Sequence, residues 1–155
     1  MSPEVLQRLF DVNHQALQLN VEGLSHEDSL LQPHPGGNCL NWVAGHIVAT
    51  RNDVLRLLGQ EPIWSAEDAA HYKRGSKPIQ SAAGARPFES ILTDFARSQE
   101  RVRAGIGNLS SESMAEKRGD STLGMALHFL QFHEAYHIGQ AALLRRMAGK
   151  EGAIP

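Results

Sequence analysis

The sequence predicts an all-α fold, an antiparallel four-helix bundle with a long crossover between the second and third helices. Four segments of about 20 residues or more repeat apolar residues at the spacing of an amphipathic helix, and no stretch alternates apolar and polar residues over a useful strand length. The segment 60–87 shows neither pattern and contains several prolines and glycines, as expected of a crossover. We expect residues 1–155 to form a single domain.

Composition argues against several classes of protein. The 15 Lys and Arg residues are dispersed and balanced by 17 Asp and Glu residues, so no nucleic-acid partner is expected. No apolar run approaches the roughly 20 residues that span a bilayer, so no membrane partner is expected either. The one cysteine, Cys39, cannot form an internal disulfide, and the first residues lack the pattern of a signal peptide. These features favour a cytoplasmic protein.

The first two predicted helices have recognisable start signals. The first extends from Pro3 to about Gly23, with Ser2 as its N-cap and proline at the first helical position. The second follows Asn38, which is the expected N-cap, and ends near Gly59.

Each of these helices carries a histidine, and the two histidines have different surroundings. His14 has polar neighbours in the sequence and is predicted to lie at the surface or at the edge of the bundle. His46 lies on or beside the apolar stripe of its helix and is expected to face inward.

Two more long helices are predicted after the crossover. A short helix is expected within the crossover at residues 65–72, where Ser65 and Asp68 resemble a capping box. The third long helix extends from Pro87 to about Leu109. The fourth begins at Ser121 or Thr122 and ends at Gly149.

The fourth helix has two histidines inside its apolar stripe, where core residues are expected. His133 and His137 are four residues apart, so both imidazoles can point toward one spot in the interior. The five residues HEAYH match the zincin pattern H-E-x-x-H, in which two histidines hold zinc and the glutamate, here Glu134, acts as general base. The alternative for Glu134 is a structural ion pair with an arginine of a neighbouring helix. His128 lies about 140° around the helix from His133 and is not an expected ligand.

A catalytic zinc usually has three protein ligands, and the third has to come from elsewhere in the chain. A metzincin would place a histidine six residues after His137, where this sequence has Leu143. Only 18 of the 155 residues follow His137, too few for a further packed helix that would carry a glutamate ligand. The third ligand should therefore lie upstream. His46 fits that position, although a histidine of this kind taken alone is more often a hydrogen-bonded core residue than a ligand.

Two segments of the sequence resemble the DinB/YfiT-like superfamily: PHPGGNCLNWVAGHIV at residues 33–48 and HFLQFHEAYHIGQAALLRRMAG at residues 128–149. In that superfamily a histidine of the second helix and an H-x-x-x-H pair followed by Gly-Gln in the fourth helix bind one divalent metal inside a four-helix bundle. The resemblance therefore implies one divalent ion, Zn²⁺ or Ni²⁺, held by His46, His133 and His137, with Gly139-Gln140 as the accompanying dipeptide.

The same resemblance implies a function, because characterised relatives include transferases for low-molecular-weight thiols. In such an enzyme the metal lowers the pKa of a thiol cosubstrate, and the acceptor is a small molecule. Two alternatives stay open: a metal-dependent hydrolase with Glu134 as general base, and a non-enzymatic metal-bearing stress-response module. We also expect a homodimer, from the resemblance and from the apolar lengths of the helices, although no sequence feature locates its interface.

Overall fold

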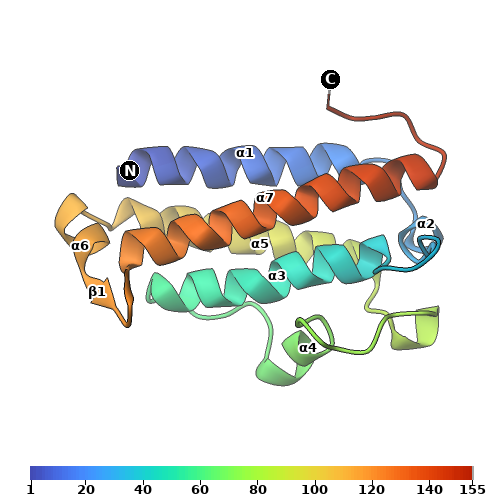
Figure 1. Cartoon of the computed structure of the whole chain (residues 1–155), viewed down its shortest axis with the longest axis horizontal. Helices are drawn as coiled ribbons and strands as arrows, with labels where there is room; N and C mark the ends of the chain where they lie inside the picture. Colours follow the sequence, from blue (N-terminus) through green and yellow to red (C-terminus); the bar gives the residue numbers. More distant parts are fainter. Residues whose placement is uncertain (155) are drawn as a thin grey trace.

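The computed structural model describes residues 1–154, in which four long helices pack side by side (Figure 1): α1 (Pro3–Val21), α3 (Leu40–Leu57), α5 (Phe88–Gly107) and α7 (Leu123–Met147). Helices α1 and α7 run in one direction, and α3 and α5 run in the other. Around the bundle the order is α1, α7, α3, α5. The predicted all-α bundle is confirmed. The crossover returns the chain to the end of the bundle where α3 starts, so α5 runs parallel to α3. Each helix therefore has one parallel and one antiparallel neighbour.

Shorter elements connect the long helices. They are α2 (His26–Ser29), α4 (Ala66–Ala70), a 3₁₀ helix (Ala82–Gly84), α6 (Ser111–Ala115) and the strands β1 (Lys117–Arg118) and β2 (Ser121–Thr122). The two strands form a small antiparallel hairpin just before α7. Within residues 1–154, no helix has both the length and the hydropathy needed to cross a membrane.

Side-chain caps fix the starts of α1 and α7. The sequence predicts the cap at Ser2, and it predicts the start of the last helix at Ser121 or Thr122. The Ser2 hydroxyl accepts a hydrogen bond from the backbone N–H of Val5, and proline follows Ser2 at the first helical position. The Thr122 hydroxyl accepts from the N–H of Met125 in the same way. Each bond satisfies one N–H that lacks a partner inside the helix.

The predicted N-cap of α3 is wrong by one residue. The N-cap is Cys39 rather than Asn38, and its side chain makes no capping hydrogen bond. Cys39 is fully buried, and its thiol lies 3.5 Å from the backbone oxygen of Ile79 in the crossover. At the start of α3 the side chain of the N-cap residue is therefore packed in the core and does not cap the helix with a hydrogen bond.

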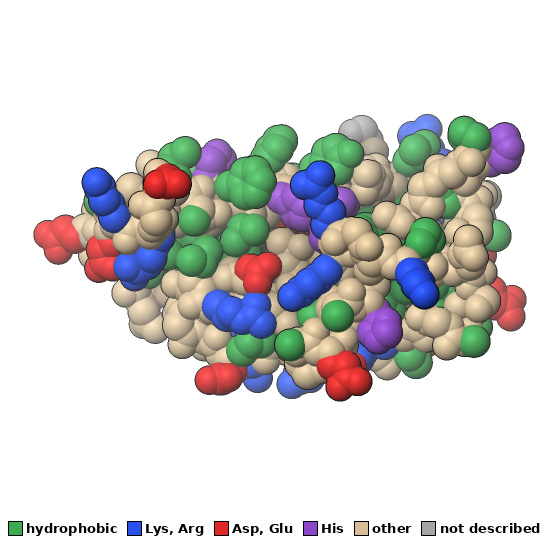
Figure 2. Space-filling model, turned by 60° about the horizontal axis from the view of Figure 1, so that its bottom comes forward, with side chains coloured by type: hydrophobic (Ala, Val, Ile, Leu, Met, Phe, Trp, Pro, Cys, Tyr) green, Lys and Arg blue, Asp and Glu red, His purple; other side chains and the backbone are tan. Residues whose placement is uncertain are grey.

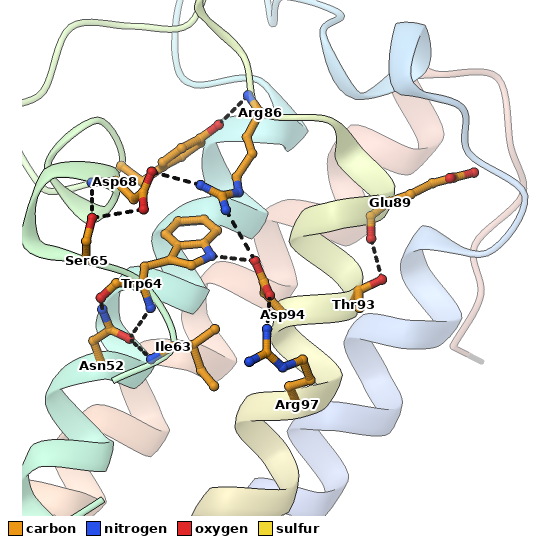
Figure 3. Close-up of polar contacts among 11 residues, drawn as sticks. Asn52, Ile63, Trp64, Ser65, Asp68, Arg86, Glu89, Thr93, Asp94 and Arg97 are labelled. Carbon is orange, nitrogen blue, oxygen red and sulfur yellow. Dashed lines mark hydrogen bonds and ion pairs between the residues drawn. The ribbon is translucent and has the colours of Figure 1, made fainter. Parts of the chain in front are cut away.

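Buried polar side chains tie the crossover to α3 and α5 (Figure 3). Asn52 of α3 donates to the backbone oxygen of Trp64 at 2.9 Å and accepts from the N–H of Ile63 at 2.9 Å. The indole N–H of Trp64 donates to Asp94 of α5 at 2.6 Å. Because buried polar groups are costly without partners, these bonds select one position for the crossover.

Arg86 and Tyr72 fix the far part of the same crossover. Arg86 pairs with Asp68 at 3.1 Å and with Asp94 at 3.7 Å. The Tyr72 hydroxyl accepts from the backbone N–H of Arg86 at 2.8 Å and donates to Asn41 of α3 at 3.1 Å. The backbone of Tyr72 is thereby held against α3, beside His46.

Candidate metal centre

Three histidine side chains meet between α3 and α7. His46 comes from α3, and His133 and His137 come from successive turns of α7. The Nε2 atom of His133 lies 3.5 Å from Nε2 of His46 and 3.2 Å from Nε2 of His137. One ligand atom from each of the three lies within 4.8 Å of the others. The structure therefore brings together the three histidines that the sequence singled out.

The separation of these nitrogens fits a shared metal ion. Two imidazole nitrogens bound at about 2.0–2.1 Å to one tetrahedral zinc lie roughly 3.4 Å apart. For two of the three pairs the observed separations, 3.2 and 3.5 Å, are close to that value, and all three atoms lie within 4.8 Å of one another. Two of the rings are buried and that of His133 is partly exposed, so the group is open on one side.

Hydrogen bonds on the other ring nitrogens orient two of the imidazoles. Nδ1 of His46 lies 2.6 Å from the backbone oxygen of Tyr72, and Nδ1 of His137 lies 2.7 Å from Oε1 of Gln140. Because these oxygens can only accept, each Nδ1 must carry the proton. Each Nε2 then presents a lone pair to the shared space, as a metal ligand requires.

The electrostatics of the site favour neutral imidazoles. The pKa of His137 is lowered to about 4, mainly by burial; the bond to Gln140 opposes the shift, and the nearby His46 and His133 add to it. Burial also lowers the pKa values of His46 and His133. Neutral histidine is the form that binds metals, and a cation between the three rings would relieve the repulsion between their lone pairs. The donor set therefore fits a divalent ion.

A glycine of α3 makes room for the group that orients His46. A Cβ atom built on Gly45 would lie 2.1 Å from Cδ1 of Tyr72 and under 3.0 Å from two more ring carbons. Only glycine therefore lets the Tyr72 ring pack against α3 while its backbone oxygen accepts from His46. On the other side of His46, the Trp42 ring stacks at a centroid distance of 4.7 Å.

A pocket of about 370 Å³ opens from the histidines to the surface. Figure 2 shows histidine side chains on this face with Lys and Arg side chains close by. Arg74 is the one charged residue of the lining other than histidine, and within residues 1–154 it forms no ion pair. The full lining comprises Asn38, Trp42, His46, Arg74, His133, Tyr136, His137 and Gln140. The pocket can thus admit a small molecule beside the three histidines.

Glu134 forms a buried ion pair with Arg51 of α3. Its two carboxylate oxygens accept from Nε and from one terminal nitrogen of Arg51, at 2.7 and 2.9 Å. Arg51 also donates to the Ser98 hydroxyl of α5 at 2.9 Å. This arrangement favours the structural alternative for Glu134. The role of Glu134 as general base stays a prediction, and the direction of its carboxylate does not support that role.

The other histidines considered in the sequence lie outside the group. His14 is partly buried, which is compatible with the edge position expected, and its ring stacks on Phe95 of α5 at a centroid distance of 4.8 Å. Burial lowers the pKa of His14 to about 4. His128 lines a separate hollow beside α6 and is not part of the group, as expected.

Fold and site together define a four-helix-bundle protein in which three histidines could hold a metal ion. The chain matches the family model of the DinB superfamily over residues 9–141 and belongs to that superfamily. The comparison with curated proteins yields no match. The family assignment that the sequence predicts is therefore confirmed.

Proposed function

We propose that His46, His133 and His137 bind one divalent ion, Zn²⁺ or Ni²⁺, and that the protein is a transferase for a low-molecular-weight thiol. The observation that carries this proposal is the convergence of three neutral imidazole nitrogens on one open pocket. Imidazole ligands suit both metals. When bound, the ion would lower the pKa of a thiol and make its thiolate available at neutral pH.

The protein's own residues support a thiol supplied from outside the chain. Cys39, the one cysteine, is buried with its sulfur against the backbone of Ile79, so it is not placed to attack a substrate in the pocket. The carboxylate of Glu134 is directed to Arg51, so its position does not favour a role as the base that activates water. A reduced thiol as cosubstrate is also consistent with a cytoplasmic protein, since thiols are kept reduced there.

Arg74 indicates which thiols the pocket should favour. It is an exposed cation in the lining, and no carboxylate among residues 1–154 lines the pocket beside it. A thiol that carries a carboxylate can therefore pair with Arg74 while its sulfur lies toward the histidines. We expect such thiols to be preferred over neutral ones of similar reactivity.

A conjugation assay tests this function with defined probes. Glutathione carries carboxylates and 2-mercaptoethanol does not, and 1-chloro-2,4-dinitrobenzene serves as acceptor for both. In the reaction a carbon–sulfur bond forms, the carbon–chlorine bond breaks, chloride leaves and the thiol proton passes to solvent. We expect the Zn²⁺- or Ni²⁺-loaded protein to accelerate conjugation, and Arg74→Ala to raise KM for glutathione roughly three- to tenfold with little change for 2-mercaptoethanol.

The alternatives give different results in parallel assays. Hydrolysis of an activated ester by the metal-loaded protein, without thiol transfer, would support the hydrolase. Metal binding without activity toward any thiol, electrophile or ester would support the non-enzymatic module. An equal effect of Arg74→Ala on both thiols would contradict the role proposed for Arg74 but not the transferase itself.

A further inference from the structure

A second hollow adjoins the pocket of the three histidines, which we call the histidine pocket. The second hollow has a volume of about 260 Å³ and shares Asn38 and Gln140 with the histidine pocket. Because α3 and α7 run in opposite directions (Figure 1), the second hollow lies beside the start of α3 and the end of α7, next along the same pair of helices. The other six residues of its lining are Pro33, Gly36, Gly37, Val43, Leu143 and Leu144.

The two hollows differ in chemistry. The histidine pocket contains the three imidazoles and the cation of Arg74. The six residues that line only the second hollow are a proline, two glycines, a valine and two leucines, so they contribute no polar side chain. Leu143 is 62% exposed, and an apolar surface of this kind gains free energy when a hydrocarbon group replaces the water on it. The second hollow therefore suits a hydrocarbon group and not a charge.

The glycines of the loop before α3 keep the second hollow open. A Cβ atom on Gly36 would meet nothing within 4 Å. Gly37 has a φ of +134°, which side chains rarely allow, and a Cβ atom there would lie 3.1 Å from Cγ of Pro33. The volume of the hollow corresponds to about eight water molecules. It has room for a short alkyl chain or one ring, and a long acyl chain would not fit.

Gln140 forms the boundary between the two hollows and is held in place on the histidine side. Its Oε1 accepts from Nδ1 of His137 at 2.7 Å, and its Nε2 donates to the hydroxyl of Tyr136 at 3.3 Å. Leu143 and Leu144 follow Gln140 by one helical turn, and His137 precedes it by about one turn. A molecule whose hydrocarbon group lies against the leucines therefore places its neighbouring atoms beside the histidines.

We propose that the second hollow binds the hydrocarbon group of the acceptor, so that the substrates are electrophiles with a short alkyl or aryl group beside the reacting carbon. This inference rests on the proposed transferase function and adds the class of the acceptor to it. The thiol occupies the histidine pocket, with its carboxylate at Arg74, which lines only that pocket. The acceptor enters from the other hollow, and its reacting carbon lies where the two meet.

Two epoxides test the proposal with the metal-loaded protein and glutathione. 1,2-Epoxypropane and 1,2-epoxyhexane have the same reactive group and differ only in the length of the alkyl chain. In both reactions the thiol sulfur forms a bond to an epoxide carbon, the carbon–oxygen bond breaks, and the thiol proton ends on the oxygen as an alcohol. Burial of the longer chain should raise kcat/KM for the hexane epoxide roughly 10- to 50-fold. Equal values for the two epoxides would overturn the proposal and leave the transferase function standing.

A matched pair of variants assigns this preference to the second hollow. Leu143→Asp places a charge in the lining and should reduce the preference to less than about threefold. Phe132→Asp is the control, because Phe132 lies about three helical turns away on the same face of α7, is 61% exposed and lines neither hollow. It should keep the parent preference. An unchanged preference in Leu143→Asp would contradict the proposed site.

Binding of unreactive analogues separates the second hollow from the transferase function. Hexane-1,2-diol and propane-1,2-diol, the hydrolysis products of the two epoxides, are titrated into the full chain and followed by NMR. We expect hexanediol to shift the amide signals of Gly36 and Gly37, propanediol to shift them much less, and Leu143→Asp to abolish the difference. These shifts without conjugation of either epoxide would support the hydrocarbon site and contradict the transferase. No shift with hexanediol would overturn the hydrocarbon site, whatever the activity.

Discussion

Replacing Arg51 by methionine should lower the free energy of unfolding by about 3–5 kcal/mol, because the carboxylate of Glu134 would remain buried without its partner. Arg51 is fully buried and Glu134 is 3% exposed, so water cannot replace the lost bonds. The Ser98 hydroxyl would lose its bond from Arg51 as well. Urea unfolding followed by circular dichroism measures the difference. A loss below about 1 kcal/mol would show that the pair is not formed as described.

The double variant Arg51→Met, Glu134→Leu serves as the matched control. Removing both charges leaves no unpaired ion, so most of the lost stability should return. This variant also separates the two roles considered for Glu134. If the residue is structural, metal affinity and thiol transfer should stay close to those of the parent protein. A folded, metal-bound double variant whose rate of ester hydrolysis falls about 10²-fold or more would instead support general-base catalysis.

The second large effect is expected for Gly45→Ala, which alters the metal site without changing a ligand. The added methyl group would overlap three ring carbons of Tyr72, which is buried and bonded to Asn41. The ring and its backbone must therefore move, and His46 would lose the oxygen that orients it. Loss of such a partner typically lowers metal affinity 10- to 100-fold. Overpacking should also lower the free energy of unfolding by about 1–3 kcal/mol.

Gly107→Ala is the control for this change. Gly107 is the last residue of α5, and a Cβ there would meet nothing within 4 Å. Its replacement should leave metal affinity unchanged and should not destabilise the fold. Isothermal titration with Zn²⁺ and urea unfolding of both variants give the comparison. Equal metal affinity in Gly45→Ala and the parent protein would exclude a role for the Tyr72 contact.

Local periodicity in the sequence was sufficient for the bundle, and the spacing of the histidines together with the resemblance to the DinB/YfiT-like superfamily singled out the three that meet in the structure. His133 and His137 share a helix face by their spacing alone, and the inward direction of His46 follows from the apolar stripe of α3. The caps at Ser2 and Thr122 are likewise local signals. Features of this kind depend on residues that are close together in the chain.

What the sequence could not provide depends on contacts between distant segments. The backbone oxygen of Tyr72 reaches His46 only because the crossover folds back onto α3. No sequence signal shows which backbone oxygen will accept a hydrogen bond from a given histidine. The pairing of Glu134 with Arg51 joins residues 83 positions apart. Gln140 did have a signal, since it belongs to the Gly-Gln dipeptide that follows the histidine pair, and the structure gives it a role on Nδ1 of His137.

The most direct test of the metal site is X-ray absorption spectroscopy of protein purified without an affinity tag and loaded with one equivalent of Zn²⁺ or Ni²⁺. We expect three imidazole nitrogens in the first coordination shell at about 2.0–2.2 Å. We also expect His137→Ala to lose stoichiometric metal and His128→Ala to retain it, since His128 lies outside the group. A first shell with fewer than three imidazoles, or full-affinity binding by His137→Ala, would contradict the site formed by His46, His133 and His137.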